Sequence, residues 1–207
     1  MYIPKHFQPE GKAAALFLNE ITAGHLISKS ENGLLSTFIP VLYEEKTNAI
    51  IGHLAKGNQQ WSLGTKEEAL FIATMNDSYI SPSWYLSKSE HGKVVPTWDY
   101  MIANIYGELI FHDDIQWLRE QVSALTNKFE ANQVKPWKLA DAPEDYVAGQ
   151  LRAIVGVELK VSRFEVSFKM SQNKSKDDLE GVIQGLIREG KNSISAKVSE
   201  LRPADKL

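Results

Sequence analysis

Short runs of apolar and β-branched residues, separated by turn residues, occupy most of the first half of the chain. This pattern is typical of β-strands. The predicted strands are residues 25–30, 34–43, 49–54, 69–75 and 100–111. Asn32-Gly33 lies between the first two and is a residue pair that favours a two-residue hairpin turn. The first half is therefore predicted to be mainly β.

A further long strand is predicted towards the end of the chain. Its apolar residues alternate from Val157 to Val161 and resume from Phe164 to Met170, one step out of phase. A slip of this kind, at Ser162-Arg163, indicates a β-bulge, which bends a strand. Bulges are common in strands that form barrels, so the slip favours a barrel.

Four segments carry apolar residues at helical spacing. They are residues 13–24, Asp113 or Asp114 to Phe129, Pro143 or Glu144 towards Ile154, and about 175–190. An aspartate can cap the second helix, and Ser175 can cap the fourth. Gly190 is expected to end the fourth helix. The remaining residues, 191–207, are weakly patterned and expected to fray.

Helices inserted between strands, without strict strand-helix alternation, predict a mainly β fold of the α+β class. The architecture we expect is an antiparallel barrel with helical additions. No repeat or linker divides the chain, so residues 1–207 are predicted to form a single domain with a C-terminal helix at about 175–190. No Gly-x-Gly-x-x-Gly follows a strand and no Walker loop is present, which argues against a Rossmann or P-loop nucleotide site.

The amino-acid composition excludes several kinds of catalytic and binding site. The 207 residues include no cysteine, which excludes disulfides, thiolate nucleophiles and cysteine-ligated metals. Redox chemistry would therefore depend on a bound cofactor. The net charge is -3, and basic residues near the C-terminus are interleaved with acidic ones, which favours a solvated face over a nucleic-acid surface. No apolar run reaches the roughly 20 residues that span a bilayer, and no secretory signal pattern is present, so we expect a cytoplasmic protein without a membrane partner.

A polar segment after the third predicted strand has the parts of an anion site. Lys56 offers a positive charge, Gly57 allows close approach of a ligand, and His53 and Asn58 offer hydrogen bonds. The alternative is an ordinary polar turn with Trp61 folded into the core.

Two aromatic segments, residues 79–85 and 95–100, flank a polar loop. Their four large rings could wall a planar ligand, or form a satellite core or a subunit interface. On the second predicted strand, Pro40 indicates an edge or a bulge, where the backbone can face a ligand. The histidines show no metal-ligand spacing, and no triad can be assigned, so we predict neither a metal nor a covalent nucleophile.

Five segments together resemble the PaiB family, and they extend from the first residue to the final helix. They are Met1–Phe7, Gly52–Trp61, Tyr79–Tyr85, Val95–Tyr100 and Lys169–Asn173. The resemblance implies a flavoprotein with an FMN-binding split β-barrel, in which two subunits form two sites across a homodimer interface. It also implies negative transcriptional regulation of sporulation and degradative-enzyme genes.

The resemblance also implies an FMN site. Lys56 is expected near the FMN phosphate, and the strand residues are expected to line the isoalloxazine ring. The remaining residues would surround the phosphate or close the site from the aromatic loops. The complete predicted set is Ser36, Thr37, Ile39, Pro40, His53, Lys56, Asn58, Trp61, Ser83, Trp84, Thr97 and Trp98.

Three functions remain open from the sequence. The first is a transcriptional regulator that binds flavin or another ligand, with DNA or a regulatory protein as a further partner. No segment resembles a helix-turn-helix, so direct reading of DNA would need an unusual surface. The second is an FMN-dependent oxidoreductase or flavin reductase. The third, less favoured, is haem binding on the same barrel.

Overall fold

The fold is that of a computed structural model, which describes residues 1–9, 11–63 and 68–203. Two compact units can be distinguished, and each is described by itself. The barrel unit comprises Ala15–Ala73 and Asn104–Glu165, and the terminal unit comprises Met1–Ala14, Thr74–Ala103 and Val166–Leu207. The predicted single domain stays a prediction.

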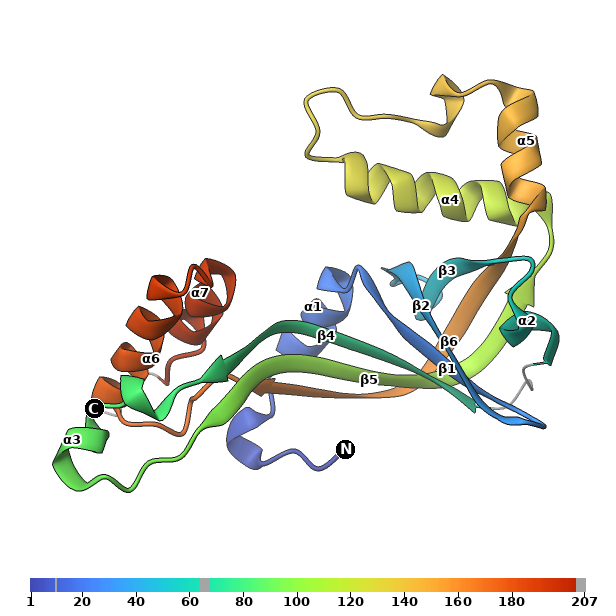
Figure 1. The fold of residues 1–207 in the computed structure, drawn as a ribbon. Coiled ribbons are helices and arrows are strands. Elements are labelled where there is room, and N and C mark those ends of the chain that lie inside the picture. Colours follow the sequence, from blue (N-terminus) through green and yellow to red (C-terminus); the bar gives the residue numbers. More distant parts are fainter. Residues whose placement is uncertain (10, 64–67, 204–207) are drawn as a thin grey trace. The chain divides into compact units, whose positions relative to one another are not determined.

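Six strands in the described part of the chain form a closed barrel in the order β1-β2-β3-β6-β5-β4 (Figure 1). β1 pairs with both β2 and β4, and β3 pairs with both β2 and β6, in each case antiparallel. The prediction of an antiparallel barrel with helical additions is therefore confirmed. The strands are β1 Ala23–Ser30, β2 Gly33–Glu44, β3 Ala49–Ala55, β4 Glu68–Ile80, β5 Thr97–His112 and β6 Ile154–Lys169.

The β1-β2 hairpin forms where the sequence predicted it. Ser30 is paired with Gly33, whose φ of 115° lies in the region that favours glycine. From residue 35 to residue 41 of β2, buried or partly buried side chains alternate with exposed ones, as expected for a strand with one face towards the core. The pairing of β2 with β1 ends at Pro40, and the pairing of β2 with β3 begins at Val41. Pro40, which has no backbone N–H, therefore lies where one pairing gives way to the other.

The barrel unit carries most of helix α1 and all of α2, α4, η3 and α5. Asp114 caps α4, because its Oδ1 accepts a hydrogen bond from the Trp117 backbone N–H at 2.8 Å. Lys128 of α4 donates to the carbonyls of Asn19 and Ile21 at 3.2 and 3.0 Å, which satisfies backbone acceptors beside the end of α1. The bounds are α1 Ala13–Glu20, α2 Gln59–Leu63, α4 Ile115–Glu130, η3 Leu139–Asp141 and α5 Glu144–Arg152.

Helices α6 and α7 pack against each other in the terminal unit (Figure 1). Ser175 caps α6, as predicted, with its Oγ 3.2 Å from the Asp178 backbone N, and Gly190 follows the helix at a φ of 74°. The predicted fraying after residue 190 is wrong for Asn192–Glu200, which forms α7, while residues 204–207 lie outside the described chain. The other helices are η1 Lys5–Phe7, η2 Pro82–Trp84, α3 Ser87–His91 and α6 Lys176–Arg188.

The long sixth strand is a single element, as predicted. Its large buried apolar side chains lie at the odd-numbered residues 155, 157 and 159 and then at the even-numbered residues 166 and 168. This change of phase agrees with the sequence pattern, and the bulge at Ser162-Arg163 stays a prediction. Among the helices that the structure describes, none is long and apolar enough to cross a membrane.

Candidate functional site

The turn between β3 and α2 is fixed by its own hydrogen bonds. The Asn58 backbone N–H donates to the carbonyl of Ala55 at 2.9 Å, and the Asn58 side-chain oxygen accepts from the Gln60 backbone N–H at 2.8 Å. The Trp61 indole N–H donates to the Lys56 carbonyl at 2.7 Å. The half-buried Trp61 ring therefore holds the turn, and the turn sets the positions of Lys56 and Asn58.

The same turn reaches the first two strands. The Asn58 amide donates to Thr37 Oγ1 at 3.0 Å. The buried Gln60 amide donates to the Leu26 carbonyl at 3.1 Å and to Ser28 Oγ at 3.0 Å. Its oxygen, Oε1, has no hydrogen-bond partner among the described residues. Since a buried acceptor without a donor is costly, this atom marks a place for a ligand or water donor.

The four predicted residues of β2 divide between its two faces. Thr37 is partly buried and Ile39 is packed in the core, whereas Ser36 and Pro40 are exposed on the opposite face. Successive side chains of a strand point in opposite directions, so these four cannot all face one ligand through their side chains. Thr37 is the one that contacts the β3-α2 turn.

Two charged or polar pairs connect β3 and the turn to α4 and to Asp113, which precedes that helix. Lys56 Nζ lies 2.5 Å from Asp113 Oδ1, with both side chains more than one-third exposed. His53 Nδ1 lies 3.0 Å from Oε1 of the buried Gln121. The structure thus places Thr37 of β2 beside the turn that carries Lys56 and Asn58, and it places the His53 ring against α4.

In the terminal unit, Ser83 and Trp84 belong to η2. Trp84 packs on α6 at Gly181 and Gly185, where the absence of a side chain makes room for it. A Cβ added to Gly181 would lie 1.9 Å from the Trp84 carbonyl oxygen, and a Cβ added to Gly185 would lie 2.2 Å from the indole ring. The ring therefore serves to pack η2 on α6, one of the alternatives that the sequence left open. These residues also border an open pocket of about 690 Å³ with Lys88 and Glu180.

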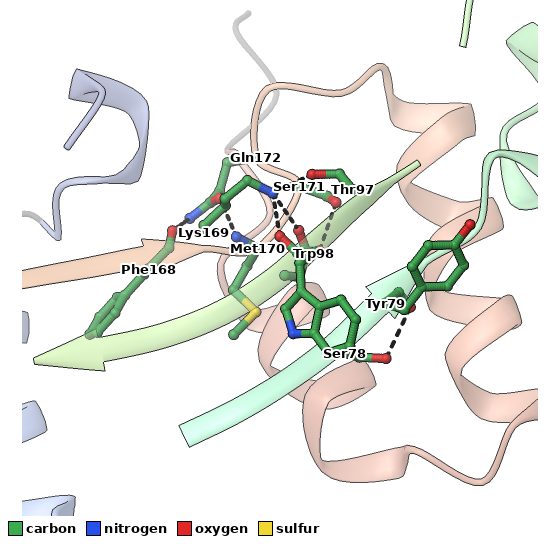
Figure 2. A network of polar contacts seen from close by, with 10 residues as sticks. Ser78, Tyr79, Thr97, Trp98, Phe168, Lys169, Met170, Ser171 and Gln172 are labelled. Atoms are coloured by element: carbon green, nitrogen blue, oxygen red, sulfur yellow. Dashed lines mark hydrogen bonds and ion pairs between the residues drawn. The ribbon is translucent and has the colours of Figure 1, made fainter. Parts of the chain in front are cut away.

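Thr97 and Trp98 begin β5 and take part in a polar network centred on Lys169. Figure 2 shows Lys169 directed towards both residues, with Ser171 and Gln172 following it along the chain. Lys169 Nζ donates to Thr97 Oγ1 at 2.7 Å and to the Trp98 carbonyl, and lies 3.5 Å from Asp99 Oδ1. Ser171 Oγ donates to the other Asp99 oxygen at 2.7 Å.

The Asp99-Lys169 pair is strongly shielded from solvent. The Asp99 side chain is 0% exposed and the Lys169 side chain 21% exposed. Burial raises the pKa of Asp99 above 3.8, although Ser171 and Lys169 oppose the rise, and burial lowers the pKa of Lys169 below 10.5, although Asp99 opposes the fall. The pair therefore depends on its mutual attraction and its hydrogen bonds to stay charged.

The model of the family described as "Putative FMN-binding domain" matches residues 1–163. The chain belongs to this FMN-binding domain family. A Bacillus subtilis relative, "Protease synthase and sporulation protein PAI 2", is 29% identical over 205 residues, which cover 97% of this chain and 96% of the relative. The PaiB resemblance is therefore confirmed.

Two solved structures share the fold. Protein Rv2991 of Mycobacterium tuberculosis gives a TM-score of 0.59 at 11% identity, over 84% of this chain and 94% of that protein. An FAD- and haem-binding protein of Mycobacterium smegmatis gives 0.56 at 13% identity, over 81% and 77%. At these identities the likeness shows the fold alone, which confirms the predicted split barrel.

FMN is the cofactor that the FMN-binding domain family implies, and the β3-α2 turn fits it. A phosphate and a ribityl chain need a positive charge, neutral donors and acceptors for hydroxyl groups. Lys56 offers the charge, Asn58 and Thr37 offer polar side chains, and the unpaired Gln60 Oε1 offers a buried acceptor. These residues could hold the polar part of FMN.

Several polar residues in these networks were not among the predicted site residues, and Gln60, Asp99 and Lys169 are the most buried or most connected of them. Gln60 lies within the segment that the sequence singled out, so its position beside Asn58 was a usable signal. Asp99 and Lys169 lie within two of the family-like segments, but 70 residues separate them. Their pairing follows from the terminal unit's tertiary structure, which spacing along the chain does not reveal.

Proposed function

We propose that this chain binds FMN at the β3-α2 turn, forms a homodimer and acts in negative transcriptional regulation. The observation that supports FMN binding is the cluster of Lys56, Asn58 and Thr37 beside the unpaired buried oxygen of Gln60. Bound FMN would supply a redox-active ring that no side chain of this chain can replace. The regulatory role is what the PaiB resemblance implies, and the Bacillus subtilis relative's name links it to protease synthesis and sporulation.

The FMN site can be tested by titrating the purified protein with FMN and following the flavin absorption and fluorescence. Lys56→Ala should raise the Kd about tenfold, because a charge-assisted hydrogen bond contributes roughly 1.5–3 kcal/mol. Lys160→Ala removes an exposed lysine of the same unit and should bind FMN as the wild type does. Absence of FMN binding by the wild type would refute the proposal, and unchanged binding by Lys56→Ala would refute the role of Lys56.

Regulation is proposed to act through a protein partner. The net charge of -3 disfavours a surface that neutralises many DNA phosphates. In gel-shift titrations with promoter DNA, the chain alone should cause no retention even at low salt. Retention that weakens steadily with increasing salt would show direct DNA binding and contradict this mode of action.

A further inference from the structure

A second cavity lies in the barrel unit among α4, α5 and the segment that joins them, and it shares no residue with the β3-α2 turn. It has a volume of about 260 Å³. Its walls are apolar and include Val122, Leu139, Val147, Leu151 and Ile154. Cavities of this kind, apolar with one or two polar groups, are typical of small-molecule sites.

The walls of the cavity are held in place by contacts around them. Leu118, Val147 and Leu151 form a buried cluster between α4 and α5. Arg119 of α4 forms an ion pair with Glu144 of α5. The joining segment is tied back to α4, because the Trp137 backbone N–H donates to Glu130 Oε2 at 3.0 Å. A preformed cavity loses little conformational entropy when a ligand enters.

The partly buried polar side chain of His53 gives the cavity a chemical preference. His53 lines it, and Nδ1 of this ring lies 3.0 Å from Oε1 of the buried Gln121. With the Gln121 amide oriented so that Oε1 faces the ring, we assign the proton to His53 Nδ1, which leaves Nε2 as an acceptor. Nε2 forms no hydrogen bond with the described residues. Gln150 and Tyr146 also line the cavity but are exposed, so the partly buried His53 ring offers the more shielded acceptor and suits a ligand with one donor.

The volume of the cavity and the aromatic residues at its opening favour an aromatic ligand. An apolar cavity of ~150 Å³ can take up benzene, so about 260 Å³ suits one or two fused rings but not a flavin with its ribityl phosphate. Trp137 and Tyr146 line the same cavity and are 43% and 60% exposed, which leaves ring faces and edges available to a second aromatic system.

We propose that this cavity binds a small aromatic compound of one or two rings that carries a hydroxyl group. The hydroxyl group donates a hydrogen bond to His53 Nε2, and the rings lie against the apolar wall and the rim. The site is separate from the FMN site and can be occupied at the same time.

Isothermal titration calorimetry with two matched probes tests this site. 2-Naphthol carries the donor, and 2-methoxynaphthalene has the same rings without it. The wild type should bind 2-naphthol saturably and about tenfold more tightly than the ether, since one hydrogen bond contributes up to roughly 1.5 kcal/mol. His53→Phe should abolish the preference for 2-naphthol. His91→Phe, at an exposed histidine of α3, should keep it.

Absence of saturable binding, or an unchanged preference in His53→Phe, would overturn the proposal. Circular dichroism establishes whether His53→Phe is folded, and Gln150→Trp provides a second variant. Gln150 is exposed and lines the cavity, so a tryptophan there should block both probes without removing a buried group. Repeating the titration with saturating FMN should give the same affinity, and competition would contradict two separate sites.

Discussion

The Asp113 carboxylate would compete with the FMN phosphate for the positive charge of Lys56. The carboxylate lies 2.5 Å from Lys56 Nζ, and both groups are exposed enough for solvent to weaken the pair. Asp113→Asn removes the competing charge and keeps the side-chain size. We expect FMN to bind about threefold more tightly to this variant, in the same absorption titration. Unchanged or weaker binding would indicate that Lys56 serves the ion pair and not the phosphate.

Lys169 is expected to be essential for stability because its partner is fully buried. Lys169→Met would leave the Asp99 carboxylate without its cation, and removal of one partner from a buried pair costs about 3–5 kcal/mol. Urea denaturation should show a loss of about 3 kcal/mol in the free energy of unfolding. The double variant Lys169→Met with Asp99→Asn should lose less than Lys169→Met alone, because no buried charge remains.

The stability loss in the single variant Lys169→Met should depend on pH. The folded-state pKa of Asp99 is raised above 3.8 by burial, so the folded protein takes up this proton more readily than the unfolded chain does. This group therefore favours the folded state increasingly as pH falls through the raised pKa towards 3.8. Without Lys169 the pKa should rise further, so the stability loss in Lys169→Met should shrink at acidic pH. A loss that stays constant with pH would contradict a charge-based cause.

At the residue scale, the sequence identified local groups and missed distant pairs. Lys56, Asn58 and Trp61 share one turn, and the hydrogen bonds that join them span five residues or fewer. Thr97 and Trp98 were predicted as flavin residues, but their observed polar partner, Lys169, lies about 70 positions further along the chain. Only the folded terminal unit brings such residues together.

At the element scale, the fit of η2 on α6 depends on two glycines. Gly185→Ala would place a Cβ 2.2 Å from the Trp84 indole, so the ring or the helix would have to move. We expect a loss of about 1–3 kcal/mol in the free energy of unfolding, which is typical of overpacking. Thermal and urea denaturation measure it.

Gly149→Ala in α5 is the matched control. The nearest neighbour of a Cβ there is the flexible end of the Arg152 side chain at 4.0 Å, and alanine favours helix by about 1 kcal/mol over glycine. This variant should be as stable as the wild type or slightly more stable. Equal effects at Gly149 and Gly185 would show that helix propensity, and not contact with Trp84, decides the outcome.

The elements with a clear amphipathic pattern or a cap were the ones the sequence predicted. α4 and α6 have both, and their caps at Asp114 and Ser175 are observed. α7 was missed because its buried side chains, Ile194, Ser195 and Val198, give only two large apolar positions. The five-residue helices α2 and α3 were also missed, since one turn of helix has too few residues to show a period.

At the scale of the whole molecule, the outward face of β2 is where we expect a second copy of the chain to bind. Leu34 is 74% exposed and Phe38 62% exposed, and these two side chains alternate with those of the core-facing residues. Large apolar side chains gathered on one exposed face are typical of protein interfaces. Ser36 and Pro40, predicted to line the flavin, lie on the same face of the strand.

Sedimentation equilibrium should therefore give a mass twice that of the 23.3 kDa chain. The double variant Leu34→Lys with Phe38→Lys should sediment as a monomer, because two charges on each copy would have to be buried in the interface. It should also bind FMN more weakly if Ser36 and Pro40 contact the flavin across that interface. Val134→Lys, at a side chain that is 100% exposed, is the control and should remain dimeric. A dimeric double variant would exclude this face of β2 as the interface, and a monomeric one with unchanged FMN affinity would place the whole cofactor site within one chain.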